Sequence, residues 1–260
     1  MSGYILCQTK KAEVPYYIEN ISTNIYSLEE LCYYLYHNLY LIDQTIINEG
    51  LCDWLAKELD LTELAGKLRP NVGKFSQAED ILYPIFKEIN YLSYEELRTL
   101  NTQLLKLDAQ EPAVRDKKKG DSLVENGMYV NAIRVYQKLL ERGNLEQAKA
   151  GLTRSVYHNL ACAYSYLFQM EKASECFFKA YELSGSKEDL VIYLLAFKSA
   201  KTPIEYESRL EELKVPKDIL ALVKEKEECF VKIPEKPVYS QYVDELLDEF
   251  TRDYHRSTGA

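Results

Sequence analysis

Glycine and proline are scarce in this sequence, with 10 glycines and 8 prolines among 260 residues. Both residues interrupt helices. Their scarcity, together with apolar residues that recur at helical spacing along the chain, predicts a mostly helical globular protein. A chain of this length can bury a sizeable core, and we expect one or two domains.

Histidine is also rare, and the usual signatures of catalysis are missing. No two of the three histidines are placed to share a metal ion, and no glycine-rich phosphate loop or G-x-S-x-G elbow occurs. His158 and Cys162, one helical turn apart, are the only cysteine–histidine pair at contact spacing. A cysteine in mid-helix has no free backbone amide beside it to stabilise an oxyanion. We therefore expect no enzymatic activity, no metal and no cofactor. An enzyme would need a site where residues 27–110 meet the segment that follows.

The cysteines form no C-x-x-C pair and follow no secretory segment. They stand at positions 7, 32, 52, 162, 176 and 229. The longest strongly apolar run, Leu190–Phe197, is too short to cross a bilayer, and residues 1–25 lack an apolar stretch behind basic residues. These features predict a cytoplasmic protein with reduced thiols. A net charge of −9 and a pI near 5.1 argue against nucleic acid or a membrane as the partner.

The sequence does contain an internal repeat between Ala113 and Tyr181, with an offset of 41 residues. The corresponding positions are Gly120 and Ala161, Leu123 and Tyr164, Ala132 and Ala173, Tyr136 and Phe177, and Leu139 and Ala180. Each copy has a small residue in its first half, then an alanine and an aromatic residue four positions apart. This spacing is typical of two antiparallel helices whose backbones approach at small side chains while large ones fill the remaining space.

The repeat resembles the tetratricopeptide repeat (TPR) family, most clearly in Tyr157–Tyr164 followed by Ala173, Phe177 and Ala180. The resemblance covers about a quarter of the chain and implies a protein that binds other proteins through stacked helix pairs. It does not identify the partner.

The repeat length differs from that of the family. A TPR has about 34 residues, so the first copy carries about seven more. Seven residues are almost two helical turns and keep the same face towards the neighbouring helix. The extra residues are expected within Asn144–Arg154, where Asn144 and Gln147 form a capping-box pattern. A HEAT or armadillo array has a period nearer to 41 but does not explain the small residues.

These observations predict an all-α fold, namely an antiparallel helix-pair solenoid with the right-handed superhelix of TPR proteins and an N-terminal helical bundle. We expect an extended or short β strap at 1–26, an N-terminal helical region at 27–110, the TPR-like repeat pair at 111–186, degenerate repeat or capping helices at 187–232, and a C-terminal amphipathic helix at 238–256. Helix starts are expected at Ser27–Glu30, Ser76–Glu79, Ser93–Glu96, Thr202–Glu205 and Pro216. Pro84 should bend its helix, and Pro15–Ile18 has β character.

In TPR proteins the first helix of each repeat lines the concave face. Aligning the two copies identifies the residues expected to contact a peptide or partner protein there. They are Lys117, Asp121 and Val124 from the first copy, and His158, Asn159, Cys162 and Ser165 from the second.

Some TPR proteins bind a C-terminal carboxylate with lysine and asparagine side chains, and Lys117 and Asn159 fall on two matching positions. Asp121 replaces an asparagine of that site and would repel a carboxylate. Asp189 and Tyr193 stand where the site has basic residues. A peptide of basic character therefore suits this acidic chain better.

Our main hypothesis is a non-enzymatic adaptor whose solenoid face binds a peptide or partner protein. The second is a self-assembling or autoinhibited protein. In this hypothesis the C-terminal helix fills the groove of the same chain, or of a second copy in a homodimer. Its apolar residues recur at four-residue spacing, namely Tyr242, Leu246, Phe250 and Tyr254. That helix could instead cap the end of the solenoid.

Overall fold

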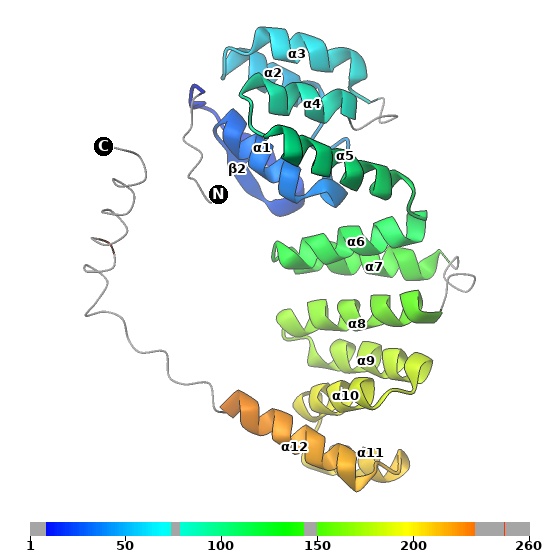
Figure 1. Cartoon of the computed structure of the whole chain (residues 1–260). Helices are drawn as coiled ribbons and strands as arrows, with labels where there is room; N and C mark the ends of the chain where they lie inside the picture. The colour runs from blue at the N-terminus through cyan, green and yellow to red at the C-terminus, as the bar shows by residue number, and fades with distance from the viewer. Residues whose placement is uncertain (1–8, 74–78, 143–149, 232–246, 248–260) are drawn as a thin grey trace.

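The computed structural model describes residues 9–73, 79–142 and 150–231, together with Leu247. Over these residues the chain forms twelve α-helices and one two-stranded sheet (Figure 1). The predicted all-α fold with a short N-terminal β segment is confirmed. Four predicted features lie wholly or partly outside the described residues. They are residues 1–8 of the strap, the cap at Ser76, the extra residues within Asn144–Arg154, of which 150–154 are described and helical, and the C-terminal helix at 238–256 apart from Leu247.

The β segment is a hairpin of β1 (Tyr16–Ile18) and β2 (Thr23–Ile25), paired antiparallel. One isoleucine of each strand is buried in the core. The strap that precedes the hairpin is fixed to the helices, because the indole of Trp54 donates a hydrogen bond to the carbonyl of Val14 at 2.8 Å. The predicted β character of the residues after Pro15 is thus confirmed, with β2 as the pairing strand.

Five of the described α-helices follow the hairpin, and the N-terminal part of the chain also has three short 3₁₀ segments. In chain order these elements are η1 (Glu19–Ile21), α1 (Leu28–His37), η2 (Leu39–Leu41), α2 (Glu49–Lys57), α3 (Thr62–Leu68), η3 (Arg69–Asn71), α4 (Glu79–Glu88) and α5 (Tyr94–Asp108). Of the 3₁₀ segments, η1 lies between the two strands, and η2 and η3 follow α1 and α3. The Ser27 hydroxyl accepts a hydrogen bond from the Glu30 amide, which caps α1. Ser93 and Glu96 form the complete capping box predicted for α5. These two helix starts are confirmed.

The sequence did not indicate α3. This helix has only seven residues, and its N-cap residue, Leu61, has no side-chain oxygen to accept a hydrogen bond from the first turn. Pro84 lies inside α4 as expected, and the helix continues beyond it to Glu88.

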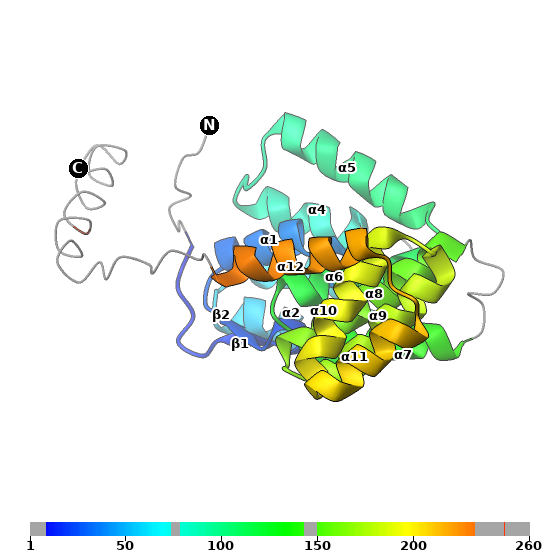
Figure 2. The same ribbon diagram turned by 90° about the horizontal axis from the view of Figure 1, so that it is seen from below.

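The rest of the described chain is a stack of antiparallel helices. They are α6 (Pro112–Glu125), α7 (Tyr129–Glu141), α8 (Ala150–Tyr166), α9 (Met170–Ser184), α10 (Lys187–Ala200), α11 (Pro203–Glu212) and α12 (Lys217–Val231). From α6 to α11 successive helices contact each other, and α6 also contacts α8 while α10 contacts α12. The helices therefore form two rows, a first row of α6, α8, α10 and α12 and a second row of α7, α9 and α11 (Figure 2). This is the helix-pair packing of a solenoid.

The predicted small-residue contacts are present in this stack. Ala132 in α7 and Ala173 in α9 are fully buried, and so is Ala161 in α8. A Cβ atom at Gly120 would overlap the ring of Tyr136, so α6 and α7 approach closely only because Gly120 has no side chain. The internal repeat thus corresponds to two helix pairs built with the same kind of close contact.

The N-terminal helices and the stack share one hydrophobic core. A single cluster of buried residues runs from the strap before β1 to α12. Polar contacts reinforce the junction: the Lys119 ammonium lies 2.8 Å from an Asp43 carboxylate oxygen, and the Asn126 amide donates to the Asn38 side-chain oxygen at 2.8 Å. Through these contacts α6 joins the N-terminal helices to the helix pairs.

Candidate functional site

The residues predicted to line the concave face lie on α6 and α8, where Asp121 links two others. One Asp121 carboxylate oxygen lies 2.7 Å from the Lys117 ammonium. The other accepts hydrogen bonds from the Asn159 amide at 2.7 Å and from the Tyr136 hydroxyl at 2.8 Å. Burial raises the pKa of Tyr136, which keeps that hydroxyl protonated as a donor. Lys117 and Asn159 therefore meet, but Asp121 already binds both, and neither is arranged to receive a peptide carboxylate.

A second carboxylate, Asp189 at the start of α10, ties α10 to α8. Its side chain is 1% exposed and accepts two hydrogen bonds from the Arg154 guanidinium, at 2.8 and 2.5 Å, and one from the Ser184 hydroxyl at 2.5 Å. Chiefly because of the Arg154 hydrogen bonds, the pKa of Asp189 falls to about 2. The carboxylate is ionised at neutral pH and serves as a structural link in the first row.

His158 is close to the second of these clusters. Its Nδ1 is 3.7 Å from an Asp189 oxygen and has no hydrogen-bond partner among the described residues. Its ring packs edge-on against Phe177, with centroids 5.4 Å apart. Burial lowers the pKa of His158, so the ring is neutral at pH 7. Burial also raises the pKa of the Cys162 thiol, which disfavours the thiolate needed for nucleophilic attack.

The remaining predicted residues contribute mainly to packing. Val124 and Cys162 pack against the hydrophobic core, and the Ser165 hydroxyl donates to the carbonyl of Ala161 at 2.9 Å. All seven predicted residues are half-buried. Because several of their polar groups are bound within the protein, this face has limited capacity for new hydrogen bonds. A role for it in binding stays a prediction.

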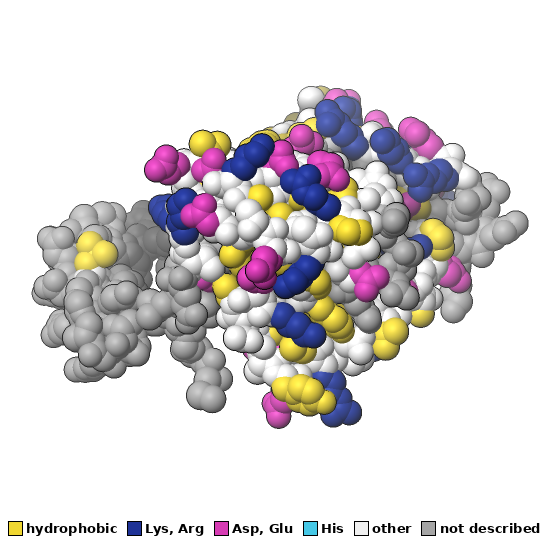
Figure 3. Space-filling model, turned by 90° about the horizontal axis from the view of Figure 1, so that it is seen from above, with side chains coloured by type: hydrophobic (Ala, Val, Ile, Leu, Met, Phe, Trp, Pro, Cys, Tyr) yellow, Lys and Arg dark blue, Asp and Glu magenta, His cyan; other side chains and the backbone are white. Residues whose placement is uncertain are grey.

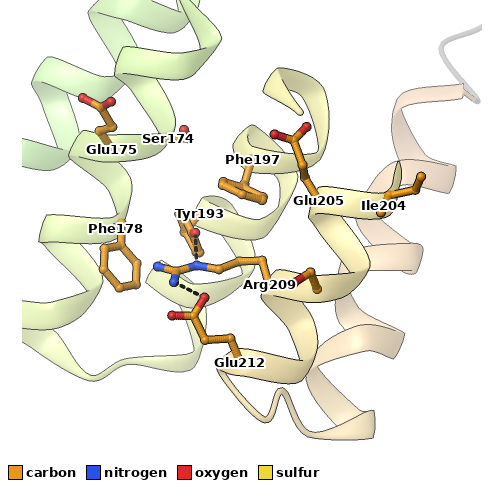
Figure 4. Close-up of a pocket in the computed structure, with 10 residues that line it drawn as sticks. Ser174, Glu175, Phe178, Tyr193, Phe197, Ile204, Glu205, Arg209 and Glu212 are labelled. Carbon is orange, nitrogen blue, oxygen red and sulfur yellow. Dashed lines mark hydrogen bonds and ion pairs between the residues drawn. The ribbon is translucent and has the colours of Figure 1, made fainter. Parts of the chain in front are cut away.

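A groove lies in the second row, between α9 and α11 (Figure 4). We call it the second-row groove; its volume is about 550 Å³. Its lining residues are Ser174, Glu175, Phe178, Tyr193, Phe197, Ile204, Glu205, Ser208, Arg209 and Glu212. Phe178, Tyr193 and Phe197 give it an aromatic floor, and Ile204 at its mouth is 81% exposed. Open concave sites with apolar floors and a few polar groups are typical of ligand-binding surfaces.

Arg209 is fixed at one end of the second-row groove. Its guanidinium carbon lies 4.6 Å from the centroid of the Phe178 ring, a cation–π contact. Its Nε donates to the Tyr193 hydroxyl at 2.8 Å, and one terminal nitrogen lies 2.6 Å from a Glu212 carboxylate oxygen. The positive charge is therefore balanced within the protein, and the planar guanidinium forms part of the floor.

The rim of the second-row groove is acidic. Glu175 projects from α9 and Glu205 from α11, and both are exposed. Glu205 also accepts the capping-box hydrogen bonds of Thr202, which lower the pKa of its carboxyl group. Because both carboxylates face solvent, each can pair with a positively charged ligand.

The sequence did not identify this groove, because its residues come from three helices brought together only by packing. In the structure, α11 begins at Pro203, has the exposed Ile204 as its second residue and contains no buried residue. A helix of this kind covers little core and leaves one side open to another molecule.

Other surfaces are less well formed. The face seen from above in Figure 3 shows lysine and arginine side chains interspersed with aspartate and glutamate and with small apolar areas. A hollow of about 400 Å³ lies between α1, η2 and α5. There the Gln110 amide donates to the Tyr40 hydroxyl at 3.2 Å, so its polar groups are partly satisfied. The second-row groove is the more distinct candidate site.

Two further kinds of feature are absent among the described residues. Within the described ranges, no helix combines the length and apolar character needed to cross a membrane. The same residues contain no group of three or more histidine, cysteine, aspartate or glutamate side chains suited to hold a metal ion.

Comparisons with known proteins do not assign a function. No family model, curated protein or solved structure matches the chain.

Proposed function

We propose that this protein is a non-enzymatic, TPR-like adaptor that binds a peptide segment of a partner protein on its stack of helix pairs. The observation that carries the proposal is the second-row groove, with its aromatic floor and acidic rim. A preformed apolar surface provides affinity, and a few charged groups at its edge orient the ligand.

The groove's chemistry favours a peptide with an apolar side chain next to a basic one. The apolar side chain would lie over Phe178 and Phe197, and the lysine or arginine would pair with Glu175 or Glu205. Arg209 would not repel it strongly, because Glu212 balances its charge. The net charge of −9 also favours encounter with a basic partner.

As part of the same proposal, the protein works in a reducing compartment such as the cytoplasm and has no catalytic role. Among the described residues, Cys32, Cys52, Cys162, Cys176 and Cys229 are free thiols, which is usual where thiols are kept reduced. The raised pKa of Cys162 disfavours Cys162 and His158 as a nucleophile and base.

A peptide array followed by fluorescence anisotropy with the full-length protein tests the proposal. Peptides with an apolar residue beside lysine or arginine should bind. Glu175→Lys and, separately, Ile204→Ser should each weaken binding about ten-fold, which corresponds to one lost ion pair or apolar contact in a partly desolvated site. Neither side chain is buried, so both variants should fold normally.

Glu182→Lys is the matched control, because Glu182 is exposed on the same helix but does not line the groove. It should leave the affinity within about two-fold of wild type. Absence of any peptide sensitive to Glu175→Lys and Ile204→Ser would contradict the proposal. Binding that is lost instead in Lys117→Ala or Asn159→Ala would place the adaptor site on the first row.

A further inference from the structure

A group of exposed apolar side chains lies at the edge of the stack where first-row helices turn into the second row. Phe168, in the turn between α8 and α9, is 89% exposed; Tyr166 at the end of α8 is 59% and Val130 in α7 is 50% exposed. The ring of Tyr129 stacks on that of Tyr166, with centroids 4.5 Å apart and planes inclined by 7°. We call these four residues the turn-edge patch. A hollow of about 240 Å³ adjoins it.

The backbone at Phe168 does not explain why a phenylalanine is present. α8 ends with the amides of Phe168 and Gln169 donating to the carbonyls of Ser165 and Tyr164, at 2.9 and 3.0 Å, which is the Schellman pattern. Its central residue has positive φ, 57° at Phe168 and 74° at Gly127 in the equivalent turn after α6. Glycine is favoured there because a Cβ is strained in this conformation. An exposed phenylalanine in a position suited to glycine points to a contact made by its ring.

The chain itself contains a segment with matching chemistry, residues 238–256. Its apolar residues recur at four-residue spacing, and its acidic residues lie between them. The apolar ones are Tyr242, Leu246, Phe250 and Tyr254, and the acidic ones are Asp244, Glu245, Asp248, Glu249 and Asp253. Leu247, which the structure describes, is helical. An amphipathic helix of this kind is stabilised by burying its apolar stripe against a complementary surface.

Charge favours the turn-edge patch as that surface. Arg134 and Lys172 are exposed one helical turn beyond Val130 and Phe168, respectively, so acidic side chains on a docked helix would meet positive charge. The second-row groove, in contrast, has an acidic rim and would repel them.

The outer side of α12, at the end of the stack, is a poor alternative. Its exposed residues are mostly charged, among them Lys224, Glu225, Lys226 and Glu228, while Leu222 is 40% exposed. A charged outer surface is what a terminal helix of a solenoid needs in order to face water, so no further capping helix is required there.

The geometry of the stack brings the segment to the patch. Figure 1 shows the end of α12 and the α8–α9 turn on the same side of the stack. In the first row α12 is two helices away from α8, which is about 16–20 Å at usual interaxial distances. The intervening residues 232–237 can extend to about 20 Å. The segment can therefore reach the patch without any rearrangement of the helices.

We propose that residues 238–256 pack their apolar stripe onto the turn-edge patch of the same chain, with their acidic residues beside Arg134 and Lys172. This intramolecular contact is separate from the second-row groove and leaves that groove open to a partner.

Hydrogen exchange of the full-length protein tests the contact. In the wild type, amides of residues 242–254 should exchange at least about ten-fold more slowly than in a free peptide of the same sequence. Phe168→Gly keeps the turn geometry but removes the ring, and these amides should then exchange within about two-fold of the peptide rate. Arg134→Glu combined with Lys172→Glu should reduce the protection as well. Leu105→Gln, which alters an exposed leucine on α5 away from this edge, is the matched control and should change nothing.

Three outcomes would overturn the proposal. The first is exchange at the free-peptide rate in the wild type. The second is protection that survives both Phe168→Gly and the charge reversal. The third is protection that disappears on dilution, because it would show that a second copy supplies the segment. If Phe168→Gly also exposed the amides of α8 and α9, Tyr166→Ser would replace it with the same expected result.

Discussion

At the scale of single residues, two helical glycines show how adding one methyl group can have opposite effects on stability. A Cβ at Gly120 would overlap the ring of Tyr136, which is fully buried between helices. A Cβ at Gly66, in α3, would have no atom outside its own helix within 4 Å. The same substitution is thus an overpacking change in one helix and a helix-favouring change in the other.

We expect Gly120→Ala to lower the free energy of unfolding by about 1–3 kcal/mol, because Tyr136 must leave its position or α6 must move away from α7. Gly66→Ala should raise it by about 0.5–1 kcal/mol, because alanine has less conformational freedom to lose on folding. Urea denaturation of both variants checks the pair. A Gly120→Ala protein as stable as wild type would mean that α6 and α7 are not in close contact.

Asp189 gives a second prediction at this scale, since its carboxyl has a folded-state pKa of about 2. A pKa below the unfolded value of about 3.9 stabilises the fold above that pH, and the stabilisation is lost as the pH falls from about 4 to about 2. The shift corresponds to about 2–3 kcal/mol. The stability difference between wild type and Asp189→Asn should therefore be largest above pH 5 and shrink by about this amount on acidification.

Denaturant unfolding between pH 6 and pH 2.5 measures this difference. Asp218→Asn is the control, because Asp218 forms an exposed ion pair with Lys187. Exposed pairs contribute little, so that variant should show a much smaller change with pH. A pH-independent difference for Asp189→Asn would refute the role given to the Arg154 hydrogen bonds.

At the scale of helices, most of the architecture was predictable because its signals are local. Capping boxes at Ser93 and Thr202 identified the starts of α5 and α11, and small residues at Ala132 and Ala173 identified the packed pairs. The short α3 was missed because no polar side chain caps it. Helix starts depend on neighbouring residues, and sequence therefore reports them well.

The candidate site was harder to predict, because it depends on contacts between distant residues. The alignment placed Lys117 and Asn159 on adjacent helices correctly, but it could not reveal that Asp121 binds both. Likewise, Arg209 lies against Phe178 only because α11 packs beside α9. Repeat patterns specify which face of a helix is buried; they do not specify how polar side chains pair across it or where two helices separate to leave a groove.

At the scale of the whole molecule, the continuous hydrophobic core joins the N-terminal helices to the stack. A substitution that lowers the free energy of unfolding at one end should then also destabilise the helices at the other end. Leu55→Ala, at a fully buried position in α2, should cost about 2–5 kcal/mol. Since the core is shared, hydrogen exchange governed by global unfolding should accelerate equally in α2 and in α8. Acceleration confined to α1–α4 would show that the two regions unfold separately.

The hydrogen bond between Trp54 and Val14 has a practical consequence. Trp54 is the only tryptophan in the sequence, and it is nearly buried where the strap crosses α2. Its fluorescence thus reports on one place in the molecule. Detachment of the strap would let water reach the indole and move the emission to longer wavelength, even if every helix stayed folded. Native emission alone can therefore follow, without any attached label, whether a bound partner loosens or tightens the N-terminal strap.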